Sequence, residues 1–251
     1  LIARGVAAQP GEAGGGRRRF SGGENLERMV GKRLLPTPFN LWDDPTSSEY
    51  QGIPLAGHYR YDSEGVAPEK VGLVEGGKLR AMLMARTPTT KFSGSTGHGR
   101  GGRSGSIRAT VGNLFIEHSE GLSEEELTEA LLATAEMSGL EYGLRVSALV
   151  PGMASLMSGG SMQDMRAFFQ RQRGGGGGSP SALGDPLYVF KVYVKDGREE
   201  RVRGLEFDSV SVSTLRDIML AGRKQVVWNQ TGSTSSSVIA PAVLFEELDL
   251  Y

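Results

Sequence analysis

Alternating apolar and polar side chains mark the clearest strands of this chain. Residues 187–195 and residues 198–203 both follow a period of two, and they flank the pair Asp196-Gly197, which favours a tight reversal between antiparallel strands. We therefore predict a β-hairpin over residues 187–203, the strongest hairpin signal in the chain.

A second hairpin is predicted where Gly76, Gly77 and Lys78 separate the apolar segments 70–75 and 79–86. Shorter apolar runs predict further extended segments, and the Gly/Ser/Thr-rich stretch between two of them predicts a long loop. The extended segments are residues 39–42, 58–61, 111–117, 225–228 and 238–248, and the loop is residues 87–106. So many short strands favour a fold made mainly of sheet.

Helical periodicity is confined to a few places. The strongest helix begins after Ser123, whose hydroxyl is suited to cap it, with Glu126 at the capping-box position and Gly139 at the expected C-terminal end. We predict that residues 123–138 form the longest helix. Shorter helices are predicted over residues 24–34, 162–172 and 213–220. The expected fold class is α+β: a β-rich antiparallel or barrel-like sheet with a few helices.

Glycine-rich segments divide the chain. Residues 11–23 combine glycines with three consecutive arginines, and such a segment buries too little apolar area to offset its ordering entropy. We predict a flexible arm over residues 1–23, one domain over residues 24–251, and within that domain a flexible glycine-rich insertion at residues 174–180. Because the chain begins with Leu1, we also expect its natural start to lie upstream.

Charge and cysteine content narrow the classes of function. The 251 residues include 28 basic and 29 acidic side chains, and a net charge of -1 gives no reason to expect a nucleic-acid partner. There is no cysteine, which excludes disulfides, thiolate metal sites and cysteine nucleophiles. No apolar run reaches the roughly 20 residues of a membrane helix, so we expect no membrane partner and a cytoplasmic protein.

The chain contains three histidines, His58, His98 and His118, whose imidazoles could bind a metal or a substrate. His58 lies in a predicted strand, where a hydrogen-bonded structural role is the default, and His118 follows a strand and is expected to be solvated. His98 lies between two glycines of the long loop, where small neighbours let another backbone approach closely. His98 is therefore the best of the three for contact with a substrate, and the alternative is that its loop is only a flexible connection.

Eight short segments, taken in their order, carry a resemblance to a known family. They are residues 43–46 (DDPT), 61–66 (YDSEGV), 74–79 (VEGGKL), 96–100 (TGHGR), 111–117 (VGNLFIE), 184–204, 212–222 and 237–248. No single segment is specific, but together the series is similar to the C-terminal domain of the TldD/PmbA family of bacterial and archaeal peptidases. The resemblance covers roughly residues 24–250.

The resemblance implies a β-rich domain that forms a homodimer, or a heterodimer of one TldD-like and one TldE/PmbA-like subunit, around a chamber for unfolded peptides. In the TldD-like subunit it implies a His-Glu-x-x-x-His helix and a downstream cysteine that bind the catalytic zinc, with the glutamate activating water. This chain has no such helix motif in residues 1–40, and residues 229–233 lack the cysteine. Two explanations stay open: a TldE/PmbA-like partner subunit without metal, or a metal-bearing half upstream of Leu1 with a different third ligand.

The function expected from the resemblance is a non-metal-binding subunit of a TldD/PmbA-type metallopeptidase that holds an unfolded peptide. No catalytic or metal-binding residue is expected in this chain, and zinc is expected only in a partner subunit or in a missing N-terminal half. The candidate substrate-binding residues are Gly97, His98, Gly99, Arg100 and Asn113. The alternative is a non-catalytic peptide-binding or assembly protein that has kept the fold.

Overall fold

The computed structural model describes residues 6–7, 26–101, 106–149, 186–207, 210, 212–232 and 234–250. The chain divides into two compact units, each made of two stretches of sequence. The first unit holds residues 1–119 and 225–241, and the second holds residues 120–224 and 242–251.

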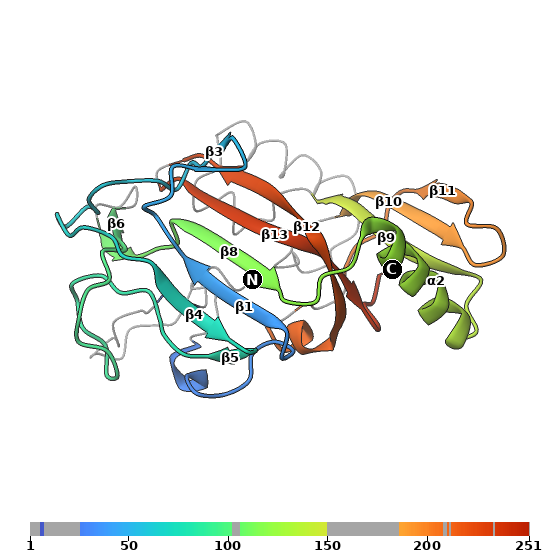
Figure 1. Cartoon of the computed structure of the whole chain (residues 1–251), viewed down its shortest axis with the longest axis horizontal. Coiled ribbons are helices and arrows are strands. Elements are labelled where there is room, and N and C mark those ends of the chain that lie inside the picture. The colour runs from blue at the N-terminus through green and yellow to red at the C-terminus, as the bar shows by residue number, and fades with distance from the viewer. Residues whose placement is uncertain are drawn as a thin grey trace. The chain divides into compact units, whose positions relative to one another are not determined.

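The first unit is built on a six-stranded sheet with the strand order β12-β13-β8-β1-β4-β5 (Figure 1). Its strands are β1 (Phe39–Asp43), β4 (Val71–Glu75), β5 (Lys78–Leu79), β8 (Asn113–His118), β12 (Ile218–Gln230) and β13 (Ser236–Phe245). The pairs β1–β4, β1–β8 and β4–β5 are antiparallel, whereas β13 and β8 run parallel. The unit boundary falls within β12 and β13, whose residues 218–224 and 242–245 belong to the second unit.

Both faces of this sheet carry apolar side chains. Phe39, Leu41 and Asp43 alternate along β1 and are all buried, so one face of the strand points into the core of the first unit. On the opposite face, Trp42 stacks on Phe115 of β8 with ring centroids 5.4 Å apart. A buried acidic side chain at the end of an apolar stripe needs a polar partner, and Asp43 therefore marks a site of interest.

Smaller elements surround the sheet of the first unit. They are the 3-10 turn η1 (Leu26–Met29), the ribbon of β2 (Glu49–Tyr50) and β3 (Ile53–Pro54), and the ribbon of β6 (Gly99–Gly101) and β7 (Ile107–Ala109). Val6 and Ala7 are buried, although they belong to the predicted arm, and the N–H of Leu83 donates to Val6 O at 2.9 Å. These two residues therefore belong to the core.

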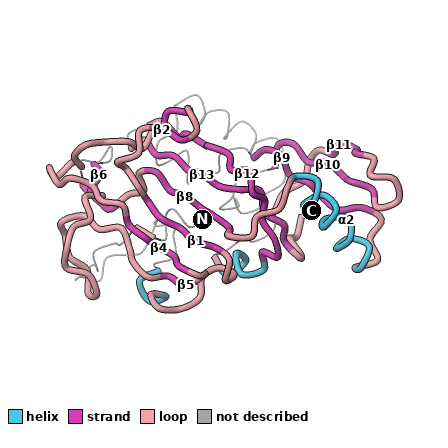
Figure 2. Tube along the Cα trace, in the orientation of Figure 1, coloured by secondary structure: helices cyan, strands magenta, loops and turns pink. Residues whose placement is uncertain are grey.

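The described part of the second unit contains a three-stranded antiparallel sheet and one α-helix. The strands are β9 (Tyr142–Leu149), β10 (Pro186–Tyr193) and β11 (Glu199–Val202), in the order β11-β10-β9. Helix α2 (Glu124–Met137) packs against β9 so closely that a Cβ added at Gly143 would lie 2.7 Å from Leu131. Figure 2 shows that strands outnumber helices throughout the described residues, and the predicted β-rich α+β class is confirmed.

Several sequence predictions are confirmed. The hairpins at residues 70–79 and 187–203 form, and α2 has the predicted capping box between Ser123 and Glu126. Gly139 follows α2 with a φ of 69°, a left-handed value that glycine adopts at little cost.

Two predicted helices are wrong in extent. Of the helix expected over residues 24–34, the described part contains only η1, because Gly31 turns the chain with a φ of 87° and donates its N–H to Leu79 O at 2.8 Å. The helix expected over residues 213–220 is a single 3-10 turn, η2 (Ser213–Asp217), and β12 begins at the next residue. In both places, backbone groups that a longer helix would need are used in the sheet instead.

Two predicted strands are also wrong. Residues 58–61 form a loop, in which the N–H of Tyr59 donates to Pro45 O at 3.1 Å. Beyond Leu79 the strand expected to residue 86 stops, and Met84 O accepts the N–H groups of Thr96 and His98 instead. Conversely, the expected loop over residues 87–106 contains β6.

Other predictions fall on residues outside the described ranges. These are the helix at residues 162–172, the insertion at residues 174–180, and most of the arm at residues 1–23. Within the described part of the chain, no helix has the length and apolar character needed to cross a membrane.

The capping box of α2 gives a stability prediction for the second unit. Ser123→Ala removes the hydroxyl that accepts the N–H of Glu126 at 3.1 Å, so we expect the free energy of unfolding to fall by about 1 kcal/mol. Urea unfolding, followed by circular dichroism, measures this change in the free energy of unfolding. Thr128→Ala, on the same helix, is the matched control and should be neutral or stabilising. Equal losses in the two variants would contradict a specific role of the cap.

Candidate functional site

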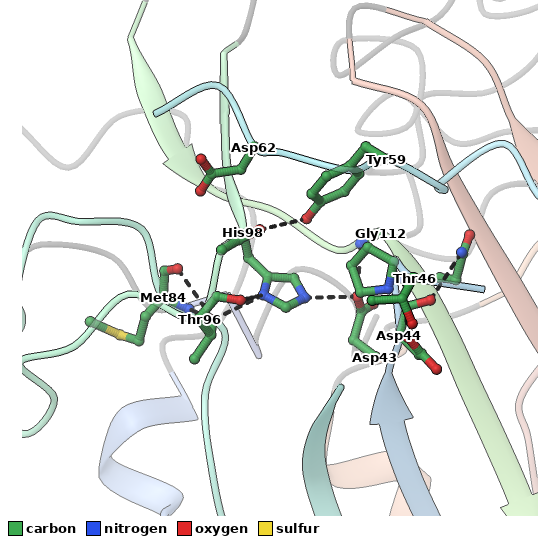
Figure 3. A network of polar contacts seen from close by, with 12 residues as sticks. Asp43, Asp44, Thr46, Tyr59, Asp62, Met84, Thr96, His98 and Gly112 are labelled. Carbon is green, nitrogen blue, oxygen red and sulfur yellow. Dashed lines mark hydrogen bonds and ion pairs between the residues drawn. The ribbon is translucent and has the colours of Figure 1, made fainter. Parts of the chain in front are cut away.

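The polar centre of the first unit is a contact between two fully buried side chains, Asp43 and His98. Neither exposes any side-chain surface, and His98 Nε2 lies 3.0 Å from Asp43 Oδ1 (Figure 3). Asp43 ends β1, whereas His98 directly precedes β6, so the contact joins the main sheet to the β6–β7 ribbon. Burying these polar groups is tolerated only because they hydrogen-bond one another.

The other ring nitrogen of His98 is also occupied. Its Nδ1 lies 2.8 Å from the carbonyl oxygen of Thr96 and 2.9 Å from the Thr96 hydroxyl. That hydroxyl accepts the N–H of Met84 at 2.8 Å and lies 3.2 Å from the carbonyl oxygen of Met84. The imidazole is therefore held on both sides, and its loop is fixed to the segment around Met84.

Asp43 and Asn113 organise the chain at the end of β1. Asp43 Oδ1 also accepts the N–H of Gly112 at 3.1 Å, and Asn113 Nδ2 donates to the carbonyl oxygens of Asp44 (3.1 Å) and Ser47 (2.9 Å). Among the described residues, Asp43 Oδ2 and Asn113 Oδ1 are buried without a hydrogen-bond partner. The two side chains thus tie β8 to the turn that follows β1.

Tyr59 and Arg100 form the more accessible rim of this network. The hydroxyl of Tyr59 donates to Gly97 O at 2.9 Å, and the guanidinium of Arg100 lies 4.3 Å from the centre of the Tyr59 ring. Burial raises the pKa of Tyr59, and the positive charge of Arg100 only partly opposes this rise. Tyr59 therefore acts as a neutral hydrogen-bond donor that holds the glycine-rich loop.

Arg100 itself is only partly satisfied. The residue is partly exposed, but its Nη1 atom is buried and has no hydrogen-bond partner among the residues that the structure describes. An unpaired buried donor is costly, and a peptide carbonyl or carboxylate would satisfy it. Among the sequence-predicted site residues, Arg100 is the charged side chain with partial exposure.

Asp62 provides a second anchor for the same loop. Its Oδ2 accepts the N–H of Gly99 at 2.9 Å, and its Oδ1 accepts the N–H groups of Glu64 (2.9 Å) and Val66 (2.8 Å). A carboxylate with three backbone donors is well satisfied in a buried position. The loop that carries Arg100 is thus held by Asp43 and Asp62 from two sides.

The series Asp43, His98 and Thr96 contains the residue types of an acid–base relay, but its geometry does not support nucleophilic catalysis. His98 and Asp43 expose no side-chain surface, and the hydroxyl of Thr96 already accepts a backbone N–H. A nucleophile must reach its substrate, and here neither the base nor the hydroxyl is open to one. The network therefore positions the loop rather than performing chemistry.

The described residues also do not fit a catalytic zinc site. Such a site needs about three protein ligands, and the described part of the chain holds no group of three His, Cys, Asp or Glu side chains that could bind a metal. Both nitrogens of His98 are engaged, His58 Nδ1 lies 2.9 Å from Pro45 O, and His118 packs edge-on against Phe39. No reaction step of this chain is therefore assigned to a metal.

The structure brings all the sequence-predicted site residues close to this network. Gly97, His98 and Gly99 are buried, as is Asn113, and Arg100 is the one with partial exposure. Substrate contact by these residues stays a prediction, and Arg100 is the member whose environment favours it.

Sequence reasoning did not identify Asp43, Tyr59 and Asp62 as members of the site. Asp43 and Asp62 lie in two of the short segments that carry the resemblance, but neither was among the candidate site residues. A usable signal existed for Asp43, because it continues the buried alternation of Phe39 and Leu41 and must therefore face the core.

Comparison with known proteins places the chain in a family. Residues 12–174 match the family described as the PmbA/TldA metallopeptidase C-terminal domain. The match extends over more than half of the chain, which therefore belongs to this family, and the resemblance seen in the sequence is confirmed. No protein with a curated description matches the chain.

Solved structures support the same fold. TldE from Thermococcus kodakarensis superposes with a TM-score of 0.59 at 18% identity, and a Thermotoga maritima protein named as a candidate modulator of a DNA gyrase superposes with a TM-score of 0.56 at 20% identity. Each comparison covers 90% of this chain but only 42% of the other protein. At these identities the likeness concerns the fold alone.

Removing the buried imidazole should destabilise the first unit strongly. His98→Ala leaves the carboxylate of Asp43 buried without its main partner, so we expect the free energy of unfolding to fall by about 3–5 kcal/mol. Urea unfolding followed by the fluorescence of the two tryptophans, Trp42 and Trp228, measures the loss. The exposed His58 is the matched control, and His58→Ala should cost about 1 kcal/mol or less. Similar losses of unfolding free energy in both variants would refute the stabilising role of the Asp43–His98 contact.

Gly97 offers an independent test of the loop. It has a φ of 69°, and a Cβ at this position would lie 2.4 Å from Ala67 O, so Gly97→Ala should cost about 1–3 kcal/mol. Gly94→Ala is the control, since no atom lies within 4 Å of its added Cβ. The same unfolding experiment compares the two, and an unchanged stability of Gly97→Ala would contradict the described packing.

Proposed function

We propose that this chain is part of the metal-free subunit of a TldD/PmbA-type metallopeptidase, and that it holds an extended peptide while a related metal-bearing subunit cleaves it. The observation that carries the proposal is the combination of family membership with a donor set that does not fit zinc. The sequence has no cysteine at any position, and the buried His98 uses both ring nitrogens within the fold. These facts support a holding role for the chain.

Arg100 is the residue that we assign to substrate binding. Arg100 is partly exposed, whereas Gly97, His98 and Gly99 of the same loop are buried, and the carbonyl oxygens of an extended peptide are acceptors for a guanidinium. The pairs Asp43–His98 and Asp62–Gly99 hold the loop of Arg100 before substrate arrives, so little ordering entropy is lost on binding. The partner subunit supplies the metal and its activated water.

The proposal predicts no peptide cleavage by the chain alone and cleavage after a TldD-like subunit is added. In that pairing, Arg100→Ala should raise KM about tenfold and leave kcat nearly unchanged, because it removes a charged hydrogen bond that holds the peptide before and during reaction. Arg80→Ala is the matched control, since Arg80 is exposed and paired with Glu75 on the surface. A fluorogenic unstructured peptide reports the rates.

Three experimental outcomes bear on the proposed function and on the role of Arg100. Chelator-sensitive cleavage by this chain alone would overturn the metal-free assignment. Binding of the peptide without cleavage in any pairing would instead support a non-catalytic peptide-binding or assembly protein. An unchanged KM for Arg100→Ala in a cleaving pair would remove Arg100 from the binding site but leave the subunit role in place.

A further inference from the structure

Both ring nitrogens of the buried His98 face an oxygen atom. Nδ1 lies 2.8 Å from the carbonyl oxygen of Thr96, and Nε2 lies 3.0 Å from Asp43 Oδ1 (Figure 3). A carbonyl oxygen can only accept a hydrogen bond, so Nδ1 must carry a hydrogen for this short contact to be favourable. A neutral imidazole has a single N–H group. The hydrogen bond between Nε2 and Asp43 therefore needs a second proton.

The hydroxyl of Thr96 does not remove this need. It lies 2.9 Å from Nδ1 of His98, but a hydroxyl that donated there would leave the lone pair of Nδ1 facing the Thr96 carbonyl oxygen at 2.8 Å. The hydroxyl instead has an acceptor in the carbonyl oxygen of Met84 at 3.2 Å, while it accepts the N–H of Met84 at 2.8 Å. With Nδ1 protonated, each of these contacts joins a donor to an acceptor.

The second proton has two possible places, and both give the same number of protons. On Nε2 it makes an imidazolium that faces an ionised carboxylate, and on Asp43 Oδ1 it makes a carboxylic acid that donates to a neutral ring. Without it, the lone pair of Nε2 would face an ionised carboxylate that exposes no side-chain surface. A charge buried in this way is costly. The Asp43–His98 contact thus holds two protons.

Charged groups around the pair do not replace this proton. Arg100 lies over the ring of Tyr59, and Asp62 accepts three backbone N–H groups. Burial raises the pKa of Tyr59, so its hydroxyl stays protonated at neutral pH. Within the described part of the chain, the side chains of the pair make no hydrogen bond with any of these groups. Further ionisable side chains on the surrounding segments are Asp44, His58, Glu64, Arg86 and Arg108.

We propose that the first unit takes up one proton at the Asp43–His98 contact when it folds, and that residues 96–100 are released from β1 when this proton is lost at alkaline pH. In an unfolded chain above pH 7, a histidine is neutral and an aspartate is ionised, so the two side chains hold one proton between them. In the folded unit they hold two. The additional proton comes from water on folding and returns to water on unfolding.

The stability of the first unit must therefore fall as the pH rises above 7. The folded unit then binds one proton more than the unfolded chain, so each pH unit multiplies the unfolding equilibrium constant by about ten. Below about pH 6.5 the histidine of the unfolded chain is charged as well, and the difference disappears. The contact holds the loop of Arg100 at neutral pH and weakens at alkaline pH, whether or not the chain takes part in peptide hydrolysis.

Urea unfolding at a series of pH values tests the number of protons. Between pH 7.5 and 8.5, the unfolding equilibrium constant of the wild-type chain should rise about tenfold more than that of His98→Gln, because the two proteins share all other titrating groups. Equal pH dependence in the two proteins would overturn the proposal.

Thr96→Val is the matched variant, because it removes the hydroxyl and leaves the carbonyl oxygen that accepts from Nδ1. It should be less stable than the wild-type chain at every pH, since the N–H of Met84 loses its acceptor, but it should keep the wild-type pH dependence. A Thr96→Val protein that lost this pH dependence would show that the hydroxyl donates to the ring, and would overturn the proposal.

Nuclear magnetic resonance of the wild-type chain gives a test that needs no variant at His98. Long-range proton–nitrogen spectra of the histidine rings should show a hydrogen on Nδ1 of His98 at pH 7.5. The loss of one set of ring signals in His58→Ala assigns that set to the exposed His58 and separates it from the signals of His98. A His98 ring with a bare Nδ1 and a hydrogen on Nε2 at pH 7.5 would need no additional proton and would overturn the proposal.

Discussion

The buried contact between Asp43 and His98 is the interaction on which the first unit depends. It joins the end of β1 to the start of β6 at 3.0 Å, and the backbone groups of Gly112 and Thr96 add one hydrogen bond to each of the two side chains. In a low-dielectric interior such a network is stable only when its members are satisfied together. The loop that carries Arg100 is positioned as a result.

Family membership and site geometry lead to complementary conclusions. The chain belongs to the PmbA/TldA metallopeptidase C-terminal domain family, yet its described side chains do not form a zinc site. A subunit that holds substrate for a metal-bearing partner accounts for both facts.

Local sequence patterns correctly predicted the elements that are stabilised by interactions between residues close in sequence. The capping box fixed the start of α2 at Ser123, and the Asp196-Gly197 pair fixed a hairpin, because neighbouring residues supply the necessary hydrogen bonds. Prediction failed where distant partners compete for the backbone. The chain near Gly31 bonds to Leu79, and Tyr59 bonds to Pro45, so neither the helix at residues 24–34 nor the strand at residues 58–61 forms as expected.

By itself the sequence determined the β-rich α+β class, the family, the absence of thiol chemistry, and the Gly97–Arg100 loop as a place of interest. Only the tertiary structure decided what each residue of that loop does. His98 stands 55 positions from Asp43 in the chain, and no local pattern shows that its imidazole is buried against that carboxylate and closed to substrate. The partial exposure of Arg100 likewise depends on which distant segments pack together, because burial is a property of the assembled fold.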